Sequence, residues 1–199
     1  MMKWNFYFIR KWALVFCVAL APAAPAGAES AAIGVVRRVY DAAVMAYSSD
    51  LALQDAASIR IRNSFDFAAL AQRAIGAPWQ QADASDRAVV IDVIARSVVT
   101  GIIQRLGKYR VGGLTILEET ALRGGDRLVR TSVALGPERI ALVDWRLQAS
   151  HDDPKIVDLI VEGRSMAVTE REKFRRELDA SGGSLKALAA TLGSRVPLR

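Results

Sequence analysis

Residues 156–192, IVDLIVEGRSMAVTEREKFRRELDASGGSLKALAATL, join a strand to a helical tail, and the rest of the chain is organised around them. The first six of these residues are apolar and rich in β-branched side chains, with Asp158 as the one charged exception, which predicts a buried strand. The Glu162-Gly163 pair that follows indicates a tight backbone position, because glycine adopts conformations that other residues rarely adopt. The strand is therefore expected to end at residue 162.

The tail carries start and stop signals for two helices. Thr169 can cap a helix together with Glu172 three residues later, so the first helix is predicted to begin near Thr169. Phe174 and Leu178 lie four residues apart and share one face of this helix. Gly182-Gly183 is typical of a helix end. A last amphipathic segment then carries three leucines: Leu185, Leu188 and Leu192.

Upstream of residue 156 the sequence predicts three more strands, at 109–121, 127–135 and 139–149, with a fourth at 155–162. The turns between them are short and contain glycine or proline, which favours hairpins and an antiparallel sheet. Side chains alternate along these runs, so Val129 and Val133 point to one face of the sheet while Arg130 points to the other. In the next strand Val143 and Trp145 form the corresponding apolar set.

Helical periodicity dominates the chain before the sheet, at residues 30–48, 55–63, 67–75 and 83–106. The last of these is the longest, with Asp83 as its expected N-cap. It places Val90, Ile94, Val98 and Ile102 on a single stripe. Helices first, then a curved antiparallel sheet of four or five strands, then helices again define an α+β fold.

Two separated blocks of sequence carry a family resemblance. The tail block consists of Asp158, Glu162-Gly163, Ser165, Phe174, Gly183 and Leu188; the second consists of Phe65-Asp66-Phe67, Leu70-Ala71, Ile75-Gly76 and Trp79. Together and in this order, over roughly residues 30–193, they resemble the MlaC-like family, also called the toluene-tolerance auxiliary family. Its members are periplasmic phospholipid-binding proteins.

The resemblance implies a non-catalytic carrier without a cofactor, and a lipid cavity between the concave sheet and the helices. Such a carrier moves phospholipid between an outer-membrane lipoprotein complex and an inner-membrane ABC transporter with an MCE-type ring, and touches membranes only transiently. One branch of the family is associated with hopanoid lipids, with which this sequence is compatible. The residues expected to line the cavity are Val90, Ile94, Val98, Ile102, Val129, Val133, Val143, Trp145, Leu159 and Val161.

The long helix departs from the family in one respect. MlaC-like proteins commonly have aromatic residues at the positions that match Val90, Ile94 and Ile102 here. Because protein interiors are densely packed, three smaller side chains must be compensated by neighbours such as Trp145 or Phe67, or must leave room for a bulkier, fused-ring lipid. Both interpretations stay open at the level of sequence.

The N-terminal 28 residues have the order of a secretory signal peptide: a basic start, an apolar core at 12–20 and small residues up to Ala28. We therefore expect export to the periplasm and one mature domain, residues 29–199. Cleavage removes Lys3, Arg10 and Lys11, which lowers the formal net charge from +6 to +3. This charge argues against nucleic-acid binding.

The mature chain is poor in metal-ligating and nucleophilic groups. The only cysteine, Cys17, lies in the leader, and His151 is the only histidine, so neither a disulfide framework nor a Cys/His metal site is expected. Ser165 lacks the glycine spacing of a nucleophile elbow. The sequence therefore predicts no catalytic serine and no metal.

Two carboxylates inside apolar strands support an alternative function. Asp144 or Asp158 could act as the general base of a small cone-shaped enzyme such as an isomerase, if burial raised its pKa. Alternation, however, places Asp144 on the face opposite Val143 and Trp145, where a cross-strand arginine is the expected partner. A third hypothesis is an adaptor that binds only proteins.

Overall fold

The computed structural model describes residues 29–47, 50–107, 113–136, 138–148 and 153–195. The predicted signal peptide and His151 lie outside these residues. In the part that is described, no helix combines the length and the apolar character needed to cross a membrane.

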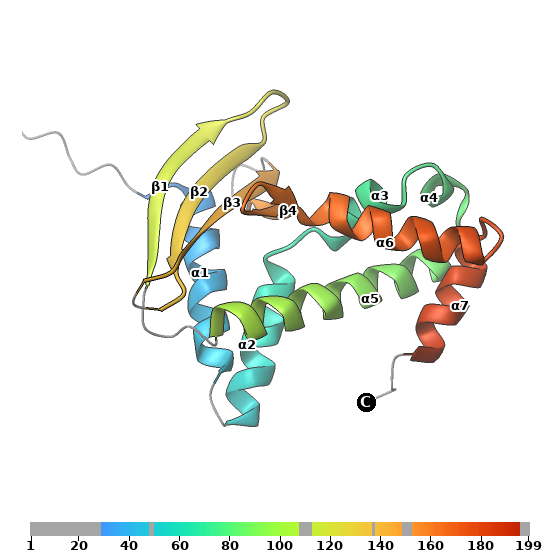
Figure 1. The fold of residues 1–199 in the computed structure, drawn as a ribbon, viewed down its shortest axis with the longest axis horizontal. Helices are drawn as coiled ribbons and strands as arrows, with labels where there is room; N and C mark the ends of the chain where they lie inside the picture. Colours follow the sequence, from blue (N-terminus) through green and yellow to red (C-terminus); the bar gives the residue numbers. More distant parts are fainter. Residues whose placement is uncertain (1–28, 48–49, 108–112, 137, 149–152, 196–199) are drawn as a thin grey trace, which may run out of the picture.

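Helices precede and follow an antiparallel sheet, which confirms the predicted α+β class (Figure 1). The elements are α1 (Ala31–Ala46), α2 (Leu51–Asn63), α3 (Phe67–Ile75), α4 (Pro78–Gln81), α5 (Ala84–Ile102), η1 (Ile103–Gly107), β1 (Leu114–Ala121), β2 (Arg127–Ala134), β3 (Ile140–Gln148), β4 (Lys155–Val161), β5 (Arg164–Ser165), α6 (Met166–Ala180) and α7 (Leu185–Arg195).

The sheet has five strands in the order of the sequence, each antiparallel to its neighbour. Two register shifts interrupt it, one in β1 between Ile116 and Glu118 and one at the β3–β4 pairing after Arg146. Such bulges increase local twist and bend the strand. The sheet is accordingly curved in Figure 1.

Helix α1 lies against one face of the sheet, next to β1 and β2 (Figure 1). The long α5 begins at the far end of the molecule, next to α4, and ends beneath the sheet, whereas α6 leads from β4 back to that far end. At that far end α6 packs against α3, and α7 packs against α5. One continuous apolar core connects the two ends of the molecule.

The start of α6 corrects one prediction. The helix begins at Met166, and its N-cap is Ser165, whose hydroxyl oxygen accepts a hydrogen bond from the Val168 amide at 3.2 Å. The Thr169 hydroxyl instead donates to the Ser165 carbonyl at 3.0 Å. The predicted capping box at Thr169 and Glu172 is therefore wrong, because a serine four residues earlier already satisfies the first turn.

Other boundaries differ more modestly. Helix α3 ends at Ile75 as predicted, with a positive φ at Gly76, whereas α2 begins at Leu51 rather than at 55, because Asp50 caps it. Asp83 is the N-cap of α5, as expected, but its side chain makes no capping hydrogen bond. The short α4, which starts at Pro78, and the two-residue β5 were not anticipated.

Candidate functional site

The residues predicted to line a cavity form a continuous apolar wall. Nine of the ten are buried, and Val161 is partly buried against the same core. Strand pairing puts Val129, Trp145 and Leu159 directly opposite one another across β2, β3 and β4, so they share a face. The helical half of the wall comes from the buried stripe of α5: Val90, Ile94, Val98 and Ile102.

One polar group lies in this wall, at a position that the alternation along β2 predicts for the apolar face. The side chain of Thr131 is fully buried on the apolar face, opposite Val143. Its hydroxyl accepts a hydrogen bond from the indole Nε1 of Trp145 at 3.0 Å and donates to the Val143 carbonyl at 2.9 Å. Both polar side chains are thereby satisfied inside the wall. The alternation of side chains predicts Thr131 on the same face as Val129 and Val133, whereas its two hydrogen bonds were not predicted.

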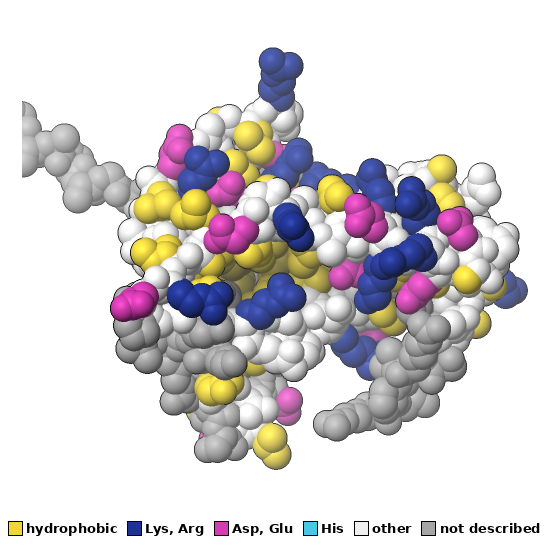
Figure 2. Space-filling model, viewed as in Figure 1, with side chains coloured by type: hydrophobic (Ala, Val, Ile, Leu, Met, Phe, Trp, Pro, Cys, Tyr) yellow, Lys and Arg dark blue, Asp and Glu magenta, His cyan; other side chains and the backbone are white. Residues whose placement is uncertain are grey.

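Figure 2 shows a hollow with an apolar floor between the sheet and α5, with Lys and Arg side chains around it. Val161 at the end of β4 and Met166 at the start of α6 are partly exposed apolar residues that pack on the core at the junction of these elements. Apolar surface is thus open to solvent beside the buried wall.

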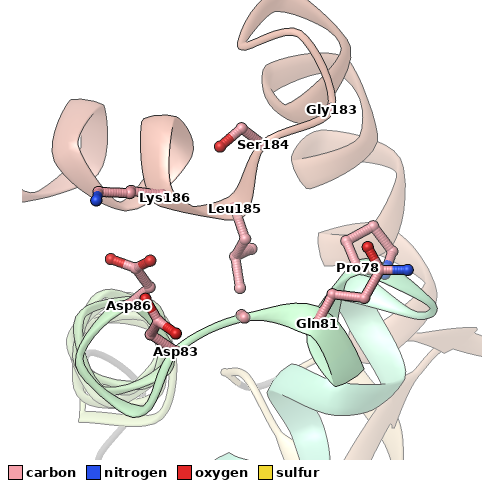
Figure 3. Close-up of a pocket in the computed structure, with 9 residues that line it drawn as sticks. Pro78, Gln81, Asp83, Asp86, Gly183, Ser184, Leu185 and Lys186 are labelled. Atoms are coloured by element: carbon pink, nitrogen blue, oxygen red, sulfur yellow. The ribbon is translucent and has the colours of Figure 1, made fainter.

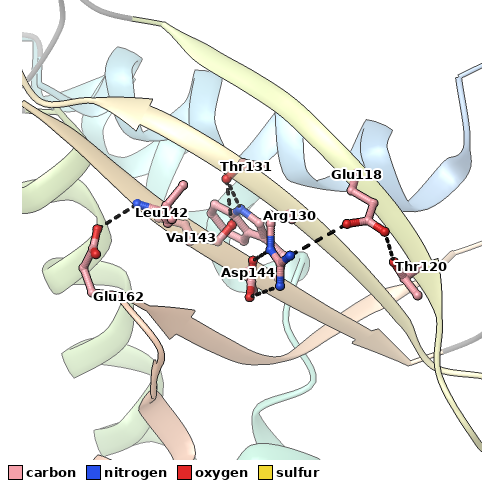
Figure 4. A network of polar contacts seen from close by, with 9 residues as sticks. Glu118, Thr120, Arg130, Thr131, Leu142, Val143, Asp144 and Glu162 are labelled. Carbon is pink, nitrogen blue, oxygen red and sulfur yellow. Dashed lines mark hydrogen bonds and ion pairs between the residues drawn. The ribbon is translucent and has the colours of Figure 1, made fainter.

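Asp144 is not in the wall. It lies on the other face of the sheet, where its carboxylate accepts hydrogen bonds from Nε and Nη2 of Arg130 at 2.9 and 3.2 Å (Figure 4). Glu118 of β1 approaches the same guanidinium at 3.7 Å. The hydrogen bond to Asp144 and its negative charge raise the pKa of Arg130. This confirms the predicted cross-strand arginine partner.

Asp158 is buried, but its oxygens are occupied by structural bonds. They accept hydrogen bonds from the Leu159 amide at 2.9 Å, the Ser165 hydroxyl at 2.6 Å and the Ala167 amide at 3.1 Å. The carboxylate therefore fixes the corner between β4 and α6. Neither it nor Asp144 is placed as a free general base.

Between β4 and α6, Glu162 and Gly163 both have positive φ angles, of 49° and 76°, as residues in tight hairpin turns do. Glutamate is strained in this conformation. Its carboxylate accepts a hydrogen bond from the Leu142 amide at 2.8 Å, which holds the turn against β3 (Figure 4). The predicted tight position is confirmed, and two residues rather than one adopt it.

A second structural cluster was not predicted. Asp126, in the β1–β2 turn, is buried and binds Arg146 of β3 at 2.7 Å, and Arg73 of α3 lies 3.8 Å from it. Arg73 also donates to the Val157 carbonyl at 3.4 Å. This cluster joins one end of the sheet to α3 and so supports the position of the wall.

Two distinct cavities lie in the helical part of the molecule, away from the predicted wall. One, of about 280 Å³, is lined by polar residues of the α4–α5 and α6–α7 connections, including Asp83, Asp86 and Ser184 (Figure 3). The other, of about 380 Å³, lies between α3 and α6. Among the described residues no group of His, Cys, Asp and Glu side chains could hold a metal ion.

Comparisons with known proteins agree with this fold. The family model described as MlaC protein matches residues 35–194. A solved structure of the phospholipid-binding protein from Ralstonia solanacearum, in complex with a phospholipid, is 19% identical in sequence to this chain. The match has a TM-score of 0.70 and covers 83% of this chain and 94% of that one. None of the curated proteins matches the chain significantly.

Proposed function

We propose that this chain, which belongs to the MlaC protein family, is a non-catalytic lipid carrier. It binds phospholipid between its sheet and its helices. The family match over residues 35–194 carries this proposal. Supporting it, the similar fold from Ralstonia solanacearum was solved in complex with a phospholipid. The proposed binding residues are the ten of the apolar wall.

The chemistry of the wall suits acyl chains. Each methylene moved out of water stabilises a complex by about 0.8 kcal/mol, so one tail represents on the order of 10 kcal/mol. A lipid that leaves a membrane must bury as much apolar surface in the protein as it buried in the bilayer. The free energies of the lipid in the two places are then similar, so exchange in either direction costs little. The hydrogen bond between Trp145 and Thr131 leaves no unsatisfied side-chain group there to oppose a tail.

We further propose that the protein works in the periplasm as the exchangeable component of an ABC transport system. It would receive and deliver phospholipid, or a hopanoid-type lipid, between an outer-membrane lipoprotein complex and an inner-membrane transporter with an MCE-type ring. The leader-like order of residues 1–28 supports export. The enzyme alternative loses support, since Asp144 and Asp158 both have structural partners.

Native mass spectrometry of the mature protein isolated from the periplasm tests the proposal. We expect the protein with an added mass of one lipid, and the same lipid in an organic extract of the sample. The denatured protein serves as the mass control. Protein that is isolated without lipid and takes up none from phospholipid vesicles would contradict the carrier function and favour an adaptor.

A further inference from the structure

The 380 Å³ cavity between α3 and α6 is separate from the apolar wall: none of its lining residues belongs to the ten predicted for the wall. It is bounded on one side by the end of α3 and the Gly76–Pro78 connection, and on the other by one face of α6. We call it the α3–α6 pocket. Its volume is at the lower end of the range for small-molecule sites.

The interior of this pocket is apolar. Phe174 and Leu178 of α6 contribute side chains that are 1% and 9% exposed, and Ile75 of α3 is 9% exposed. Phe174 and Leu178 are four residues apart and therefore lie one above the other on the helix. Together with Ala74 and Pro78 they offer a short apolar surface suited to one slim hydrocarbon chain.

The rim of the pocket is cationic. Arg171 and Arg175 also lie four residues apart on α6, and both line the pocket. Arg171 is held in place because its Nε and Nη2 donate to the Arg73 carbonyl at the end of α3. A guanidinium has five N–H donors, so these two bonds leave others available to a ligand.

Two like charges at this spacing on a helix repel each other, and an anion between them would relieve the repulsion. Glu172 and Asp179 lie three and four residues from Arg175 on α6, and neither forms an ion pair with it among the described residues. Figure 2 shows Lys and Arg side chains over α6, with Asp and Glu side chains between them. Arg171 and Arg175 are the two charged residues that line the pocket, and they favour a negatively charged group at its rim.

We infer that the α3–α6 pocket is a second binding site, which takes a single-chain anionic amphiphile such as a free fatty acid. The carboxylate lies between Arg171 and Arg175, and the chain lies over Phe174 and Leu178. The pocket is small and open to one side of α6, which does not suit a two-chain phospholipid. The inference does not depend on the proposed phospholipid site, because the two sites share no residue.

Isothermal titration calorimetry tests this inference. The mature protein, with the lipid that it retains, is titrated with sodium decanoate at concentrations below the critical micelle concentration of decanoate. We expect saturable binding at one site. Affinity should rise about fourfold per added methylene until the pocket is full, which corresponds to the burial free energy of one methylene. Decanol should bind at least tenfold more weakly than decanoate, since it lacks the charge.

Arg175→Gln should weaken decanoate binding about tenfold or more and leave phospholipid retention unchanged. Arg176→Gln is the matched control, because it removes the neighbouring exposed charge, which does not line the pocket. This variant should change neither decanoate binding nor phospholipid retention. Ile94→Phe, in the apolar wall, should leave decanoate binding unchanged.

The inference is overturned if decanoate does not bind saturably, or binds equally well to Arg175→Gln. It is also overturned if Ile94→Phe abolishes binding while Arg175→Gln does not, because decanoate would then occupy the apolar wall. A protein that retains no phospholipid but binds decanoate through Arg175 would contradict the proposed carrier function and leave the second site standing.

Discussion

The carboxylate of Asp158 accepts a hydrogen bond of 2.6 Å from the hydroxyl of Ser165, and the same hydroxyl oxygen accepts the Val168 amide at the first turn of α6. A second oxygen of Asp158 accepts the Ala167 amide. The last long strand and the helix after it are thus joined by one relay of hydrogen bonds. This relay sets the direction in which α6 leaves the sheet, and so the position of the α3–α6 pocket.

Asp158→Ala should destabilise the protein by about 2–4 kcal/mol, because it leaves the buried amides of Leu159 and Ala167 without acceptors. The free energy of unfolding from urea titration measures this. Asp144→Ala, on the solvent side of the sheet, is the control and should cost no more than about 1 kcal/mol. Equal losses in the two variants would contradict the role given to Asp158.

Thr131→Val should cost about 1–3 kcal/mol, since the indole N–H of Trp145 then lacks its acceptor inside the apolar wall. Urea unfolding measures the loss. Thr131→Ser keeps the hydroxyl and should recover most of the loss in unfolding free energy, apart from that of one methyl group. If Thr131→Val is as stable as the parent protein, the hydrogen bond contributes little to stability.

Val143→Asp should abolish lipid retention and also lower stability by a few kcal/mol, because it places an unpaired carboxylate on the buried face. Ile140→Asp on the same strand is the matched control: Ile140 is 68% exposed and lies on the opposite face. Lipid co-purifying with each variant is quantified by mass spectrometry. Unchanged lipid in folded Val143→Asp would show that this face does not line the proposed lipid site.

Ile94→Phe combined with Ile102→Tyr restores aromatic rings to the buried stripe of α5. If the smaller native side chains leave room for a fused-ring lipid, the double variant should exclude that lipid and carry a two-chain phospholipid instead. Lipid extracts of the two proteins are compared by chromatography and mass spectrometry. The same phospholipid in equal amount from both would mean that neighbours such as Trp145 simply fill the space.

Mature protein from the periplasm should begin at Glu29, which follows the small residues that end the leader. N-terminal sequencing of the periplasmic fraction checks this. A full-length chain that stays anchored to the inner membrane would contradict a freely exchanging carrier, because a tethered protein could not reach both membranes.

Local signals in the sequence were sufficient for much of the fold. The fixed period of two along β2 and β3 assigned Val129, Val143 and Trp145 to one face, and the strand register confirms this. The apolar stripe of α5 was equally clear from spacing alone, and all four of its predicted residues are buried. The spacing of apolar residues predicts these faces well because the direction of each side chain follows from the geometry of the local backbone.

Caps were predicted less well, because several polar residues near a helix start compete for the same amides. Thr169 and Ser165 both fit the pattern of an N-cap, and only the approach of Asp158 from β4 favours Ser165. Asp158 is only seven residues from Ser165, but their contact depends on the turn at Glu162-Gly163, which brings the start of α6 back beside β4. The short α4 was missed for a related reason: its first residue, Pro78, also fits a turn.

The sequence by itself determined the fold class, the order of the longer helices and strands, and which side chains form the apolar wall, since each depends on periodicity or on neighbours in the chain. Only the tertiary structure decided that Asp144 pairs with Arg130, that Asp158 fixes the β4–α6 corner, and that Arg171 and Arg175 of α6 meet the end of α3 at a pocket. The residues of such contacts can lie far apart in sequence, as Arg171 and Arg73 do, so their pairing depends on how complete elements pack together.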